Sequence, residues 1–258
     1  MSDAHSPEVM RNPADYSITQ LRALCQATAP NPAKESKIGR FSRSFSIYLT
    51  WGFLRLPFSA NHISVIGVLV FFLGVTVYFF DSVAVQLLGP VFYFLSILLD
   101  GVDGEVARFR NTQSIVGGHY VEPVSHDIMY GLFFSLLGVA AYQHFYTEWV
   151  LYAGFGASLA KVLYRSLEMR FWTIVHVGTE SENKDVQNAR AAQRAWYRRV
   201  FDFSNKNIFS YPAIVGPLLF ATYFERMDLF LYFYGIGFIA LYILLLARQT
   251  GHFMTHYH

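Results

Sequence analysis

Residues 63–80 read ISVIGVLVFFLGVTVYFF, and residues 83–99, after a two-residue break, read VAVQLLGPVFYFLSILL. A helix needs roughly 17–25 apolar residues to cross the hydrocarbon core of a bilayer, and both stretches reach that length. Four further runs match this length or fall about one residue short of it, and they cover residues 128–145, 149–164, 208–224 and 229–247. The sequence therefore predicts an all-α integral membrane protein with six transmembrane helices.

The composition agrees with a membrane protein. The 258 residues are 53% hydrophobic and 15% charged, with a mean hydropathy of +0.30. Soluble domains carry about 25% charged residues, so an ordinary soluble enzyme is disfavoured. The single cysteine, Cys25, excludes an intramolecular disulfide and a cysteine-based zinc or iron–sulfur site. The basic residues form no pattern typical of nucleic-acid binding, and we expect no nucleic-acid partner.

The part of the chain before the first run divides into two segments. Residues 1–36 are polar and lack the basic stretch before an apolar core that marks a secretory signal peptide. In residues 37–60, aromatic side chains recur at steps of three or four, namely Phe41, Phe45, Tyr48 and Trp51. This spacing predicts an amphipathic helix lying on the membrane surface, with a solvated connector as the alternative. A six-helix transmembrane domain over residues 61–250 and a tail over residues 251–258 complete the predicted organisation.

Three polar residues near the ends of the runs, Asn61, Lys161 and Arg165, lead to further predictions. We expect Asn61 to cap the first transmembrane helix. Lys161 lies near the end of the fourth run, from which its long side chain can reach the lipid headgroups. Lys161 and Arg165 share one helix face, so binding of a substrate phosphate is the alternative role for this pair.

The distribution of basic residues predicts the orientation in the membrane. With a cytoplasmic N-terminus, the outer loops are residues 81–82, 146–148 and 225–228, and Arg226 is their single basic residue. Every other Lys and Arg then lies on the cytoplasmic side or at its helix ends, as the positive-inside rule requires. The same orientation makes the long basic segment 165–207 cytoplasmic.

Acidic residues stand where the second run ends, in the sequence Asp100-Gly-Val-Asp103-Gly104-Glu-Val-Ala107-Arg108. Asp100 and Asp103 are neighbours on one helix face, and Ala107 continues that face. Carboxylates at membrane depth are costly unless they are paired or bind cations, so they indicate a functional site. The small residues Gly104 and Ala107 leave room for a flat ligand on the same face.

The third run opens with a second set of polar residues. Glu122 and His126 are four positions apart and share a helix face, whereas Asp127 is rotated by about 100° from His126. Two carboxylates on one helix and a Glu–His pair on the next can hold divalent cations, and carboxylate-rich sites suit Mg²⁺ or Mn²⁺ in phosphate chemistry. We expect Asp127 to be structural and paired with an arginine or a tyrosine.

The pattern Asp100-x-x-Asp103-Gly104-x-x-Ala107-Arg108 resembles the first half of the signature of the CDP-alcohol phosphatidyltransferases. Members of that family have six transmembrane helices, with the signature shared between the second and the third, and an amphipathic helix before the first. The resemblance also implies a homodimer. The predicted orientation places the charged segment 100–122, and with it the active site, on the cytoplasmic side.

The second half of the family signature has a glycine followed by two aspartates at fixed spacing, and this chain departs from it. The family spacing puts Val121 and Ser125 at the two aspartate positions. One extra residue in the loop, before Gly118, puts Glu122 and His126 there instead. We choose the second register, because both of its side chains can bind metal or move protons.

The resemblance implies a role for each residue of the site. The residues implied to bind two divalent ions, Mg²⁺ or Mn²⁺, are Asp100, Asp103, Glu122 and His126. His126 is also implied to act as the general base. The residues implied to hold the CDP moiety are Gly104, Ala107 and Arg108.

We therefore expect a membrane phosphotransferase that moves a substituted phosphoryl group from a CDP-linked alcohol to an acceptor hydroxyl and releases CMP, in the synthesis of phospholipid or related head groups. The donor, the hydroxyl acceptor and membrane lipid are its expected partners. A cation-coupled transporter is the alternative, but the fifth and sixth runs carry no charged residue that could line a cation path. A non-catalytic membrane scaffold is a third reading, supported by the altered second half of the signature alone.

Overall fold

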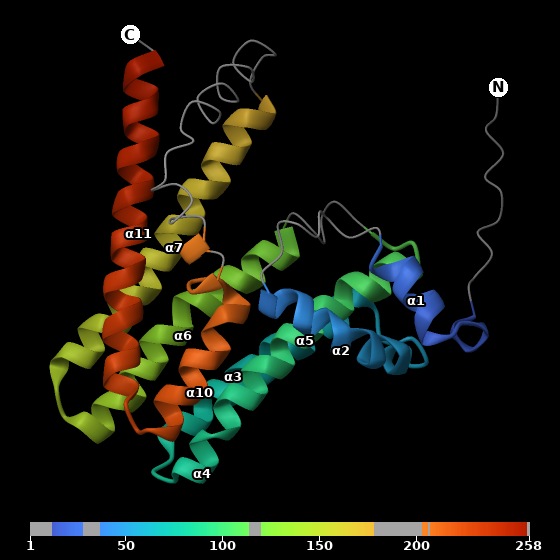
Figure 1. Cartoon of the computed structure of the whole chain (residues 1–258), viewed down its shortest axis with the longest axis horizontal. Helices are drawn as coiled ribbons and strands as arrows, with labels where there is room; N and C mark the ends of the chain where they lie inside the picture. Colours follow the sequence, from blue (N-terminus) through green and yellow to red (C-terminus); the bar gives the residue numbers. More distant parts are fainter. Residues whose placement is uncertain (1–11, 28–36, 114–119, 178–202, 206, 257–258) are drawn as a thin grey trace.

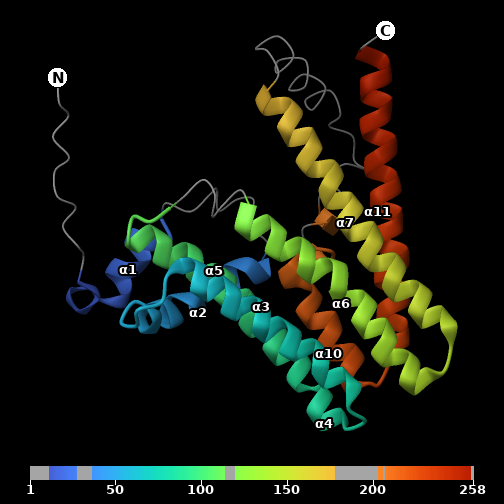
Figure 2. The same ribbon diagram turned by 180° about the vertical axis from the view of Figure 1, so that it is seen from behind.

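The computed structural model describes residues 12–27, 37–113, 120–177, 203–205 and 207–256. No strand occurs in these residues, so the predicted all-α class is confirmed. The longest helices are α5 (Leu88–Phe109), α6 (Glu122–Phe145), α7 (Glu148–Val177) and α11 (Met227–His256). Figures 1 and 2 show α7 and α11 standing side by side, with α3 (Ala60–Thr76), α5 and α6 crossing beside their lower halves.

Four helical stretches are long and apolar enough to cross a membrane, and they are Ala60–Phe79, Val83–Phe109, Glu122–Phe145 and Met227–Ala247. They correspond to the first, second, third and sixth predicted runs, the first without its last residue, Phe80. The second stretch consists of the short helix α4 (Val83–Gln86) followed by α5. The fourth run lies inside α7, and the fifth forms a shorter apolar helix, Tyr211–Tyr223, composed of η5 (Tyr211–Ile214) and α10 (Val215–Tyr223). A total of six spans therefore remains a prediction.

Small residues let the longest helices approach closely. α6 packs along α7, and α7 packs along α11. A Cβ atom added to Gly154 of α7 would lie 2.4 Å from the carbonyl oxygen of Phe134 on α6, a separation that no real side chain tolerates. Gly138 faces Gly154 across the same contact. These two glycines therefore permit the close crossing of α6 and α7.

The cap of α3 differs from the expectation. The helix begins at Ala60 and its N-cap is Ser59, whose Oγ accepts a hydrogen bond from the amide of His62 at 3.3 Å. The Ser59 amide in turn donates to Nδ1 of His62 at 3.2 Å, which completes a reciprocal capping box. The prediction for Asn61 was wrong, because Asn61 already lies inside the first turn of the helix.

The side chain of Lys161 turns into the bundle. It is 6% exposed, and its Nζ donates to the carbonyl oxygen of Phe209 at 3.1 Å. Aromatic rings surround the ammonium group, with Tyr130 at 4.9 Å and Phe238 at 4.8 Å from Nζ to the ring centroid. The expectation that Lys161 reaches the headgroups was wrong, because a carbonyl and several ring faces replace water around its charge inside the protein.

The N-terminal helices α1 (Ile18–Cys25) and α2 (Lys37–Phe53) pack against α5. In Figure 1 they lie at the side of the molecule away from α7 and α11. The small polar face of α2 is buried, while its aromatic residues Phe41, Phe45, Tyr48 and Trp51 are exposed. An outward apolar face fits the predicted position on a membrane surface, which itself stays a prediction.

Candidate active site

The acidic residues of α5 lie in its last turns, near α3. Asp100 and Asp103 project from neighbouring positions of one helix face, as their spacing predicts. The Oγ of Ser64 on α3 donates a hydrogen bond to Oδ2 of Asp103. This hydrogen bond holds the Asp103 side chain between α3 and α5.

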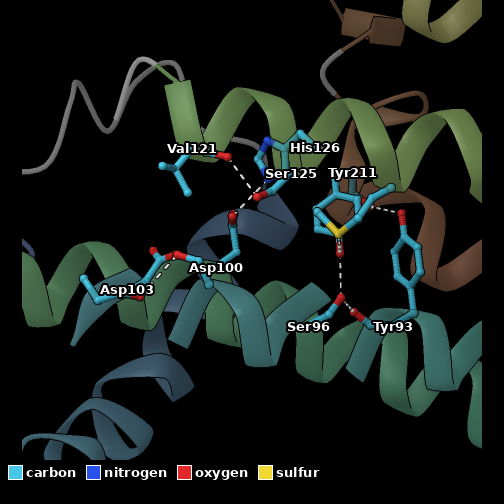
Figure 3. A network of polar contacts seen from close by, with 11 residues as sticks. Tyr93, Ser96, Asp100, Asp103, Val121, Ser125, His126 and Tyr211 are labelled. Atoms are coloured by element: carbon cyan, nitrogen blue, oxygen red, sulfur yellow. Dashed lines mark hydrogen bonds and ion pairs between the residues drawn. The ribbon is translucent and has the colours of Figure 1, made fainter. Parts of the chain in front are cut away.

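The start of α6 brings the second set of polar residues to the same place. α6 begins at Glu122, and Pro123 occupies its first turn. Proline is favoured there because the backbone N–H that it lacks would have no hydrogen-bond partner within the helix. One turn later, Nε2 of His126 lies 3.0 Å from Oδ1 of Asp100. A dashed line marks this contact in Figure 3. Ligand atoms of Asp100, Glu122 and His126 all lie within 4.8 Å of one another.

This donor set fits a divalent cation. It consists of two carboxylates and one imidazole, and Asp103 lines the same narrow cavity as these three residues. Carboxylate oxygens are the preferred protein ligands of Mg²⁺ and Mn²⁺, and an imidazole is also accepted by Mn²⁺ and other transition metals. The cluster could therefore hold a metal ion of the kind used in phosphate chemistry.

The alternative register of the signature places two different residues at the site. The Oγ of Ser125 donates to the carbonyl oxygen of Val121 at 2.8 Å, so these two positions are bonded to each other within the start of the helix (Figure 3). Val121 offers no side-chain ligand atom. Gly118, on which the choice of register depended, lies outside the described residues. The ligand atoms that meet Asp100 belong to the register of Glu122 and His126.

A second cleft adjoins the acidic cavity. Its volume is about 180 Å³, and Gly104, Ala107 and Arg108 line it. Ser64, Asp103 and Glu122 line both the cleft and the acidic cavity, so the two spaces share a wall. A ligand in the cleft would thus have one end beside the carboxylates.

Arg108 lies at the edge of this cleft and is tied to the N-terminal part of the chain. Its Nε donates a hydrogen bond to the carbonyl oxygen of Cys25, at the end of α1. Its guanidinium group also covers Gly104, since a Cβ atom added to Gly104 would lie 3.2 Å from Nη1 of Arg108. The guanidinium group of Arg108 therefore occupies space that a side chain at position 104 would fill.

Asp127 points away from the cluster. Its Oδ1 accepts a hydrogen bond from Nε of Arg165 on α7 at 2.6 Å, and the two side chains form an ion pair. The predicted pairing of Asp127 with an arginine is confirmed. Arg165 is therefore engaged by a carboxylate of the protein in this structure.

Two residues of the site carried no prediction. Ser64 stands in an apolar run, and a lone serine there was the available signal for its contact with Asp103. Tyr211 packs its ring 5.8 Å from that of His126, measured between ring centroids. It is far from His126 in sequence, and no local pattern marks it.

Comparison with known proteins agrees with this geometry. No curated protein matches the sequence of the chain. The sequence model of one family, CDP-alcohol phosphatidyltransferase, matches residues 58–192, which include α3, α5, α6 and α7 and every acidic residue of the cluster. The match covers more than half of the 258 residues. The chain belongs to the CDP-alcohol phosphatidyltransferase family, whose members transfer a phosphoryl group from a CDP-alcohol in lipid synthesis.

Proposed function

We propose that the protein transfers a substituted phosphoryl group from a CDP-linked alcohol to an acceptor hydroxyl and releases CMP. The acceptor oxygen attacks the phosphorus that bears the linked alcohol, and the bond from that phosphorus to the bridging oxygen of CMP breaks. The observation that supports this proposal most directly is the meeting of Asp100, Glu122 and His126 beside the cleft of the signature residues. A cleft with carboxylates at one end suits a nucleotide whose diphosphate must lie near bound cations.

His126 is the proposed general base. Its Nε2 faces Oδ1 of Asp100 at 3.0 Å, which favours a proton on Nε2 and leaves Nδ1 to accept the proton of the acceptor hydroxyl. Asp100 orients the imidazole in this role and stabilises the positive charge that the ring gains. The proton that Nδ1 takes up returns to solvent after CMP has left.

Asp100, Asp103 and Glu122 are the proposed ligands of two divalent ions. His126 is the alternative further ligand when Mn²⁺ is used, and its imidazole then does not serve as the base. Bound cations would neutralise the diphosphate and stabilise the charge on the leaving CMP. Gly104, Ala107 and Arg108 are the proposed binding residues for the CDP moiety: Ala107 leaves the cleft open, and Arg108, whose guanidinium lies over Gly104, places a cation at its edge.

The proposed membrane arrangement follows the predicted orientation. The six runs span the bilayer, α2 lies on its cytoplasmic surface, and the site opens to the cytoplasm. The exposed aromatic face of α2 supports this placement, because Trp and Tyr favour the membrane–water interface. Labelling of single cysteines introduced at positions 81 and 113, in a variant without Cys25, would test the side on which each end of the second run lies.

The test of the proposed activity is CMP release by the purified protein in detergent. A panel of CDP-alcohols is offered, some with a lipid alcohol and some with a polar alcohol, each with polar and with lipid acceptors. Formation of CMP that depends on both a donor and an acceptor supports the proposal. No CMP release from any pair in the panel, by a folded protein with Mg²⁺ or Mn²⁺ present, would contradict it.

A further inference from the structure

Tyr211 lies against the imidazole of His126 although it belongs to a distant part of the chain. It is the first residue of η5, and its side chain is buried. Its ring centroid lies 5.8 Å from that of His126, with an angle of 44° between the ring planes. Figure 3 shows Tyr211 and His126 next to each other between α5 and α6.

The Tyr211 ring is held from several sides. Its hydroxyl lies 2.5 Å from Oγ of Ser96, and its backbone carbonyl oxygen accepts a hydrogen bond from the hydroxyl of Tyr93 at 3.1 Å. The ring of Tyr93 packs against it at 4.9 Å and the ring of Tyr130 at 5.8 Å, between centroids. These contacts come from α5 and α6, the two helices that carry the acidic cluster. Tyr211 therefore has little freedom to move relative to that cluster.

Ser96, which anchors Tyr211, and Asp100, which contacts His126, share one face of α5. Ser96 precedes Asp100 by four positions on α5, so both side chains project from the same side of that helix. Asp100 contacts Nε2 of the imidazole. One turn away, Ser96 is hydrogen-bonded to Tyr211, whose ring packs against the imidazole ring. A hydrogen bond fixes one atom of the imidazole, whereas contact with a second ring restricts rotation of the imidazole about its side-chain torsions.

We infer that Tyr211 is a positioning residue that acts through His126, and this inference rests on the proposed function. The position of His126 is where the family signature has aspartate, and an imidazole ring must be oriented as a plane if one nitrogen is to face Asp100 and the other the substrate. Tyr211 supplies that orientation from the second half of the bundle. Its hydroxyl is hydrogen-bonded to Ser96 and its ring packs on the imidazole, so we expect its effect on the site to pass through His126.

The closing experiment compares Tyr211→Leu, Tyr211→Phe and the control Phe133→Leu. Tyr211→Leu removes the ring and should lower kcat by about threefold to tenfold, with little change in KM for the donor. Tyr211→Phe keeps the ring and should retain most of kcat, because Ser96 still donates to the carbonyl oxygen of Tyr93. Phe133 is a buried aromatic residue whose ring packs on Tyr93 and Phe134, so its change tests a general loss of packing.

A double mutant separates positioning from stability. In the His126→Ala background, Tyr211→Leu should cause no further loss of kcat, since the group through which it acts is gone. An equal loss of kcat in both backgrounds, or an unchanged kcat in Tyr211→Leu, would overturn the inference. If Tyr211→Leu does not fold, Tyr211→Met takes its place, because methionine fills space without a flat ring.

A spectroscopic measurement makes the inference independent of the reaction. In protein with labelled histidine, the ring resonance of His126 is identified by its loss in His126→Ala. It should shift in Tyr211→Leu and stay close to its original position in Phe133→Leu. A wild-type protein without CMP release would count against the proposed function, and the resonance would still decide whether Tyr211 orients His126. A resonance that does not move in Tyr211→Leu would contradict the inference even in an active enzyme.

Discussion

The Nε2 atom of His126 lies 3.0 Å from Oδ1 of Asp100. Asp100 belongs to the half of the signature that matches the family pattern, and His126 belongs to the half that departs from it. The contact brings the two halves together at one side-chain pair, so the site stays connected in the register of Glu122 and His126. The pair also gives His126 a defined nitrogen facing α5, which the roles of base and of ligand both require.

We predict that turnover needs a divalent ion and the two aspartates of α5. Excess chelator should stop CMP release, and added Mg²⁺ or Mn²⁺ should restore it. Asp103→Asn and Asp100→Asn should each reduce CMP release below detection, because an amide binds a hard cation far less well than a carboxylate. Both proteins should unfold at nearly the wild-type temperature, since these side chains line a cavity rather than the packed core.

Asp81→Asn is the matched control for these two variants. Asp81 is fully exposed and lies in the turn before α4, at the other end of the second predicted run. It should leave CMP release unchanged. Normal turnover in excess chelator, or a fully active Asp103→Asn protein, would contradict the metal assignment.

We predict that Ala107 faces the nucleotide. Ala107→Leu adds three carbon atoms inside the cleft of about 180 Å³ and should raise the Kd for a CDP ligand by about tenfold or more. Stability should change little, because the cleft is open. Calorimetric titration measures the Kd, and Ala84→Leu on the exposed side of α4 serves as the control. An unchanged Kd in Ala107→Leu would show that this face does not bind the nucleotide.

We predict that Glu105 holds the N-terminal helices on α5. The carboxylate is 1% exposed and accepts hydrogen bonds from Gln26 at 2.8 Å, from Ser46 at 2.6 Å and from Thr50 at 2.5 Å. Glu105→Ala leaves buried donors of α2 without this acceptor and should lower the free energy of unfolding by about 1.5–3 kcal/mol. Thermal unfolding in detergent measures the loss.

Glu148→Ala is the control for this change, since Glu148 is an exposed glutamate at the start of α7. It should leave the unfolding temperature nearly unchanged. Glu105→Gln keeps one acceptor oxygen and should fall between wild type and Glu105→Ala. Equal unfolding temperatures for Glu105→Ala and Glu148→Ala would show that this network does not stabilise the N-terminal helices.

Local patterns predicted those parts of the molecule that depend on helix geometry. The separation of four residues placed Glu122 and His126 on one face, and the rotation of about 100° turned Asp127 away to Arg165. The apolar runs were long enough to identify four helices that can cross a membrane. In each case one helix and its period were sufficient, and no knowledge of the neighbouring helices was needed.

Features that depend on contacts between distant segments could not be read in this way. Lys161 looked free to reach the headgroups, but the carbonyl oxygen of Phe209 and the surrounding rings draw it inside. Tyr211 meets His126 through the packing of η5 against α5 and α6, which no periodicity reveals. The prediction of the N-cap of α3 was wrong for a smaller reason. Ser59 and Asn61 are both favourable N-cap residues, and they stand two positions apart.

The last prediction separates His126 from Asp127. His126→Ala should lower kcat by about 10²–10⁴-fold with much less effect on donor affinity, as expected for loss of a general base. Asp127→Asn should retain most of kcat, because Asp127 bonds Arg165 rather than the cluster. Its cost in stability should be about 1 kcal/mol or less, since both members of this ion pair are partly exposed.

His126→Asp distinguishes the role of base from that of metal ligand, because it supplies the residue that the family signature has at this position in the register of Glu122 and His126. If the imidazole is chiefly a ligand, wild type should prefer Mn²⁺ and His126→Asp should shift the preference toward Mg²⁺. If it is chiefly a base, the choice of ion should change little. CMP release is compared at matched amounts of folded protein. A folded but inactive Asp127→Asn beside an active His126→Ala would show that the register is wrong, and that the second half of the site is built differently from the family pattern.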